Sequence, residues 1–80
     1  MDTELWRKRV TVTPNIHHGD PCIKGTRIPV AVVVGTVAEG LSHEQIIEHY
    51  PQLTREDIQA ALQYAAVVMQ SEIVAPLGKD

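Results

Sequence analysis

The stretch that decides the fold is LSHEQIIEHYPQLTREDI, residues 41–58, which contains the same helix-start signal twice. Ser42 is a good N-cap residue and Gln45 stands three residues later, which predicts a capping box. Thr54 and Asp57 repeat this spacing, with Asp57 in place of Glu or Gln. A proline between the two signals disfavours helix at the residue before it. The stretch therefore predicts one helix that ends near residue 50 and another that begins at residue 55.

The same reasoning extends the helical region in both directions. Apolar residues at helical spacing begin at Val30, Pro29 suits a first helical turn, and Gly40 suits the position just after a helix. The helix that begins at Arg55 is expected to reach roughly Val74. The expectation for residues 30–74 is a bundle of three helices.

Upstream of residue 30 the pattern is different. Residues 9–13 alternate and are rich in β-branched side chains, which predicts a strand. Residues 16–29 are rich in Gly and Pro and predict an ordered loop with a short strand at Cys22-Ile23. The expected organisation is one domain over residues 1–80: strand and loop at 9–29, helical bundle at 30–74, and a tail at 75–80.

Composition limits the kind of protein. A chain of 80 residues with 44% hydrophobic and 21% charged residues fits one small folded domain. The net charge of −3 argues against a generally basic nucleic-acid binder but leaves room for a local basic patch. The start has no apolar signal sequence, and no aliphatic stretch is long enough to span a bilayer. With its single cysteine, the chain is expected to be cytoplasmic.

The last helix is more apolar than a small domain can cover. Its main stripe consists of Ile58, Ala61, Leu62, Ala65, Met69 and Ile73. Tyr64, Val67, Val68 and Val74 extend the apolar surface around the sides. An all-round apolar helix is buried on several sides, so these four residues are expected to contact a second copy of the chain or a partner protein. A homodimer is the prediction.

Two helices joined by a short turn, with a third ahead of them, predict a helix-turn-helix. Arg55, Gln59 and Gln63 would then share the face that reads base edges. The alternative is that they form the solvated face of an amphipathic helix. Glu56 and Asp57 would repel phosphates.

Two other basic segments are candidates for phosphate contacts. Arg7, Lys8 and Arg9 are candidates for touching DNA, with a solvated charge run as the alternative. In the second segment, residues 24–27, Lys24 and Arg27 could touch phosphates through their charge. A structural turn formed by Gly25, Thr26 and Arg27 fits this segment better, with Arg27 pairing with a carboxylate inside the fold.

Enzyme chemistry is not expected. His17, His18, Asp20 and Cys22 match no standard zinc spacing, and Cys22 beside Ile23 fits a small core residue better than a catalytic thiol. No catalytic, cofactor-binding or metal-binding residue is predicted, and no cofactor.

The segment HGDPCIKGTRIPV at residues 18–30 resembles the signature of a prokaryotic domain-of-unknown-function family, numbered four hundred and thirty-three. The motifs at residues 40–42, 50–54 and 57–65 continue the resemblance, which covers about Arg9 to Ala66. Asp20 departs from it, because the family often carries Lys there.

The resemblance implies a homeodomain-like helix-turn-helix bundle with a small N-terminal β element, usually dimeric. It also implies an antitoxin that binds and neutralises a PIN-like ribonuclease toxin and autoregulates by binding operator DNA. Two rival expectations stand beside it. One is a small dimeric DNA-binding repressor, and the other is a dimerising protein-interaction module that does not bind DNA. None of the three involves a membrane.

Overall fold

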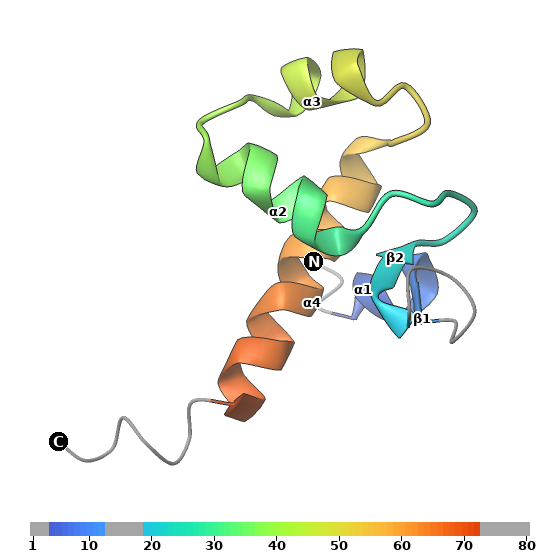
Figure 1. Ribbon diagram of the computed structural model, residues 1–80, viewed down its shortest axis with the longest axis vertical. Coiled ribbons are helices and arrows are strands. Elements are labelled where there is room, and N and C mark those ends of the chain that lie inside the picture. The colour runs from blue at the N-terminus through green and yellow to red at the C-terminus, as the bar shows by residue number, and fades with distance from the viewer. Residues whose placement is uncertain (1–3, 13–18, 73–80) are drawn as a thin grey trace, which may run out of the picture.

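The computed structural model describes residues 4–12 and 19–72, and most of these residues are helical. In chain order the elements are α1 (Leu5–Arg9), β1 (Val10–Val12), β2 (Pro21–Ile23), α2 (Val30–Ala38), α3 (His43–His49) and α4 (Arg55–Glu72). A mainly helical chain with a small antiparallel β element is therefore confirmed. α4 is the longest element and packs against α1, α2, α3 and β1 (Figure 1).

Both helix-start signals form as the sequence predicted. The Gln45 N–H donates to the Ser42 hydroxyl over 3.1 Å, and the Ser42 N–H donates to the Gln45 side-chain oxygen over 2.8 Å. Thr54 and Asp57 make the equivalent pair of bonds, over 3.1 Å and 3.0 Å. Each cap satisfies N–H groups that the first turn of a helix leaves without a partner. These bonds fix where α3 and α4 begin.

The two strands form one antiparallel pair, with Val10 opposite Ile23 and Val12 opposite Pro21. The predicted first strand is confirmed over residues 10–12, and the short second strand is confirmed with Pro21 added. The strand prediction was wrong at Arg9, which ends helix α1 instead. Thr13 and residues 16–18 of the predicted loop lie outside the described residues.

Helix α1 is an element that the sequence did not predict. Its five residues are too few to be stable alone, so its stability depends on contact with α4. The Trp6 ring meets the Tyr64 ring edge-on at 5.4 Å, and the Trp6 N–H donates to the Gln63 side-chain oxygen over 3.2 Å. A local pair, Glu4 and Arg7 at 3.1 Å, adds to the helix.

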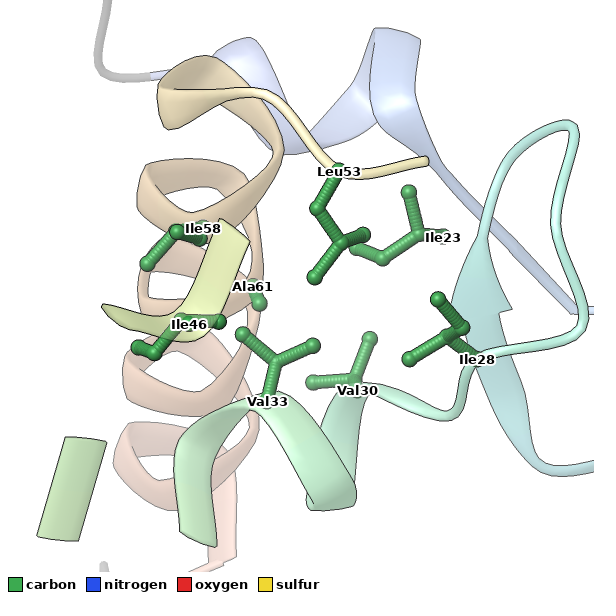
Figure 2. Close-up of a cluster of buried hydrophobic side chains, with 8 residues drawn as sticks. All are labelled: Ile23, Ile28, Val30, Val33, Ile46, Leu53, Ile58 and Ala61. Atoms are coloured by element: carbon green, nitrogen blue, oxygen red, sulfur yellow. The ribbon is translucent and has the colours of Figure 1, made fainter. Parts of the chain in front are cut away.

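The core lies where β2, α2, α3 and the first half of α4 meet (Figure 2). Its largest fully buried side chains are Ile23, Val33, Ile46 and Ile58. Figure 2 shows these four pointing into a common interior together with Ile28, Val30, Leu53 and Ala61. Cys22 is buried beside this cluster, as expected for a small core residue.

The last turns of α4 extend away from the rest of the fold (Figure 1). Val67 and Met69 are 37% and 59% exposed there. Residues Ile73 and Val74, the expected end of this helix, lie outside the described residues. Within the ranges the structure describes, no helix is long and apolar enough to cross a membrane.

Candidate functional surfaces

An apolar groove of about 470 Å³ runs between α2 and the second half of α4. Proline and valine side chains of the α2 region line one wall, and Tyr64, Ala65 and Val68 of α4 line the other. Asp20 is the one charged residue in the lining. The groove lies over the edge of the core, because Val30 belongs to both.

The residues predicted to contact a partner are divided between this groove and the open surface. Tyr64 and Val68 line the groove, whereas Val67 is exposed and is not part of the lining. Val74 lies outside the described residues. Met69 was assigned to the main buried stripe, but it is exposed. The structure thus brings three of the four predicted residues to one side of α4's second half.

The groove is connected to the N-terminal helix through an aromatic contact. Tyr64, in the groove wall, meets Trp6 of α1, and the Arg7 guanidinium lies 4.7 Å from the centre of the Trp6 ring. That distance fits a cation–π interaction. Arg7, predicted to contact DNA, is therefore engaged with Trp6 and with Glu4. Trp6 is the only tryptophan in the chain, so its fluorescence reports on this region.

The three residues expected to read DNA do not form one exposed face. Arg55 is exposed and forms an ion pair with Glu44 of α3 over 2.8 Å. Gln59 is half-buried, and Gln63 accepts a hydrogen bond from α1. Sequence spacing placed them on one side of the helix, but it did not reveal that α1 covers part of that side.

The charge environment of Glu44 fits this ion pair. The pKa of the Glu44 carboxyl is lowered most by a hydrogen bond from its own backbone N–H. The Arg55 guanidinium lowers it further. Both side chains of the pair are mostly exposed. Surface pairs of this kind add little to stability.

A second, polar cleft of about 340 Å³ is lined by Leu5, Lys8, Arg9, Lys24 and Asp57. The Arg9 guanidinium lies 3.0 Å from the Asp57 carboxylate, which is nearly buried. Lys8 and Lys24 are exposed. Sequence reasoning did not identify this cleft, because its members come from three separate segments. The signal that could have found it is the strand pairing, which sets Arg9 beside Lys24.

The groups with potential for metal or thiol chemistry are the histidine, cysteine and acidic side chains. Among residues 4–12 and 19–70, no group of three or more His, Cys, Asp or Glu residues is arranged to hold a metal ion. His17 and His18 lie outside the described residues. Burial is the main cause that raises the pKa of the Cys22 thiol, and the negative charge of the nearby Asp20 carboxylate raises it further. A raised pKa makes the thiol a poor nucleophile.

Residues 10–65, more than half of the chain, match the protein family described as "Protein of unknown function (DUF433)". The chain belongs to the DUF433 family. A crystal structure of a DUF433 member protein from Anabaena variabilis ATCC 29413, at 2.00 Å resolution, superposes with a TM-score of 0.72 and 32% identity. The match covers 79% of this chain and 62% of that one.

The uncharacterized protein y4eO of Sinorhizobium fredii (strain NBRC 101917 / NGR234) is 44% identical to this DUF433 chain over 64 residues. That alignment covers 80% of this chain and 29% of y4eO. The chain therefore spans less than a third of the length of y4eO and less than two thirds of the Anabaena chain.

In this DUF433 chain the signature loop forms a tight turn. Gly25 has a φ of 83°, which favours glycine. The Thr26 hydroxyl donates to the Ile23 carbonyl over 2.8 Å and accepts from the Ile28 N–H over 3.0 Å. Arg27 is exposed. Arg9 makes an ion pair with the nearly buried Asp57 carboxylate.

Proposed function

We propose that this DUF433 protein is an antitoxin-like component of a prokaryotic toxin–antitoxin pair, which binds and neutralises a PIN-like ribonuclease. The observation that carries the proposal is the apolar groove between α2 and α4, on a helix whose second half also exposes Val67 and Met69. On this proposal an apolar helix of the ribonuclease lies in the groove. The chain then acts by occupying the enzyme's surface and performs no catalysis.

The chemistry of the groove supports protein binding. Its lining, from the β2 and α2 regions and from α4, is apolar except for Asp20. Helix-in-groove recognition uses apolar side chains at helical spacing on the partner. Methionine adapts its shape to irregular surfaces, which suits the exposed Met69 to a contact with a protein partner. Covering this surface would remove apolar area from water, at about 25 cal/mol for each Å².

Charge supports the same class of partner. Residues 41–80 carry six acidic side chains and two basic ones. A ribonuclease needs a cationic surface to hold its polyanionic substrate. An acidic partner is therefore electrostatically complementary to it and competes with RNA.

The test compares variants of two valines with the wild-type chain. Each tagged chain is purified from the native host after nuclease treatment, and mass spectrometry identifies the proteins that co-purify. Val68→Asp places a charge in the groove wall, whereas Val12→Asp places the same charge at the exposed end of strand β1, outside the groove. We expect a near-stoichiometric ribonuclease with the wild type and with Val12→Asp, and its loss with Val68→Asp. Circular dichroism checks that both variants fold.

Two results would contradict the proposal. One is recovery of the chain with no ribonuclease. The other is a ribonuclease that Val68→Asp retains. Recovery of the chain with only a second copy of itself would favour the homodimerising module, with the same groove as its contact.

A second candidate function is DNA binding by a homeodomain-like helix-turn-helix. The observation in its favour is Arg55, which lies exposed at the start of α4, directly after the turn from α3. A repressor of this type should bind a specific duplex in a strongly salt-dependent manner. A gel-shift assay with the chain's own upstream DNA tests it, and the absence of a specific shift at low salt rejects it.

A further inference from the structure

The polar cleft concentrates positive charge in an acidic protein. Three of its five lining residues, Lys8, Arg9 and Lys24, are cationic, whereas the whole chain has a net charge of −3. The cleft shares no lining residue with the apolar groove. It therefore needs an explanation of its own, separate from the binding of a partner protein.

Backbone pairing fixes the arrangement. Val10 and Ile23 are opposite each other in the sheet, and the Lys24 N–H donates to the Arg9 carbonyl over 2.7 Å. This bond places the end of α1 and the end of β2 side by side. Two basic segments that are separate in the sequence, residues 7–9 and 24–27, are thus brought together at the first turn of α4.

The one acidic residue of the cleft is already engaged within the fold. One oxygen of Asp57 accepts from the Arg9 guanidinium over 3.0 Å, and the other accepts from the Thr54 N–H over 3.0 Å. Asp57 is nearly buried, whereas Lys8 and Lys24 lie exposed. Asp57 therefore orients Arg9, whereas Lys8 and Lys24 are the exposed cations of the cleft lining.

We propose that this cleft binds a phosphate group, carried by a nucleic-acid strand or by a nucleotide, through Lys8 and Lys24 with Arg9 behind them. Lysine ammonium groups are strong phosphate ligands that act as point charges. Phosphate contacts of this kind position a protein on nucleic acid without reading its sequence. The site is distinct from the base-reading face of α4 considered above, and it does not depend on the proposed antitoxin function.

The test uses the full chain and two charge-matched double variants. Lys8→Ala with Lys24→Ala removes two cations from the cleft. As the control, Gln52→Glu with Gln70→Glu lowers the net charge by the same two units at exposed positions that do not line the cleft. Arg9 is left in place because its loss would leave Asp57 without its ion pair. Circular dichroism and thermal melting check that both variants fold like the wild type.

Two sets of probes distinguish a phosphate group carried by a nucleic-acid strand from one carried by a nucleotide. Fluorescence anisotropy measures binding of a short labelled DNA duplex and a labelled single strand over a range of salt concentrations. NMR spectra of the amide groups follow titration with inorganic phosphate, adenosine monophosphate and, as a carboxylate control, acetate. Binding to DNA identifies a strand as the source, and binding to the nucleotide alone identifies a nucleotide. Both results support the phosphate site.

We expect the cleft variant to bind its phosphate probe roughly tenfold more weakly, and its salt slope on DNA to fall by about one for each lysine removed. The control variant should stay within about twofold of the wild type, because phosphate contacts are local. Equal losses in both variants, or a larger loss in the control, would overturn the proposal. So would the absence of binding to every phosphate probe, or an equal response to acetate.

Discussion

The two halves of α4 both carry apolar side chains, but these side chains lie in opposite environments. In the first half Asp57, Ile58, Ala60 and Ala61 are buried against α2, α3 and the turn at Leu53. In the second half Val67 and Met69 are exposed, and Val68 lines an open groove. The same helix therefore provides the core at one end and an uncovered apolar surface at the other. Apolar content alone does not distinguish a stabilising residue from a binding residue.

The largest expected effect comes from shortening a side chain in the buried half. Ile58→Ala leaves a cavity in the core and should cost about 2–5 kcal/mol of unfolding free energy. Met69→Ala, in the exposed half, should cost less than about 0.5 kcal/mol. Urea denaturation of both variants measures the contrast. If Ile58→Ala does not fold, Ile58→Val should still lose about 0.5–1.5 kcal/mol.

Similar losses for Ile58→Ala and Met69→Ala would contradict the division of α4 into two parts. They would mean that the second half is also buried in solution, as in a dimer already formed by the isolated chain. Repeating the Met69→Ala measurement over a range of protein concentrations separates these cases, because a dimer's stability depends on protein concentration.

A smaller effect is expected at the start of α4. Asp57→Ala removes both the acceptor for the Thr54 N–H and the ion-pair partner of Arg9. The loss of this cap should cost about 1–3 kcal/mol. Glu56→Ala is the matched control, because Glu56 is the exposed neighbour on the same turn, and it should cost less than about 0.5 kcal/mol. Thermal denaturation measures both, and equal melting temperatures would show that Asp57 has no such role.

The parts of the fold that sequence predicted correctly are those decided by neighbouring residues. The caps at Ser42 and Thr54 depend on side chains three residues away, so their chemistry is visible in the sequence. The limits of α2, α3 and the start of α4 followed from them, together with Pro29 and Gly40. The match to the DUF433 family was also recognisable, because its signature is contiguous.

The parts that sequence missed depend on residues that are far apart in the chain. Trp6 holds helix α1 against Gln63 and Tyr64 of α4. Trp6 and Gln63 are 57 residues apart in the chain. The ion pair of Arg9 with Asp57 spans 48 residues. No local pattern reveals either contact. This is why the sequence offered residues 7–9 and 24–27 only as two separate basic segments and did not predict that Lys8 and Lys24 line one cleft.

The smallest effect on stability is expected for the surface ion pair between Arg55, at the start of α4, and Glu44 of α3. Arg55→Ala should leave the melting temperature at neutral pH almost unchanged, because both side chains are mostly exposed. The pKa of Glu44 is lowered in the folded chain, so the small stabilisation from this carboxylate is present above its ordinary pKa and is lost as the pH falls through the lowered value. Melting curves of the wild type and Arg55→Ala should therefore differ least in acid. A clear loss of stability at neutral pH would show that Arg55 is structural, whereas a loss of DNA affinity at unchanged stability would identify it as a binding residue.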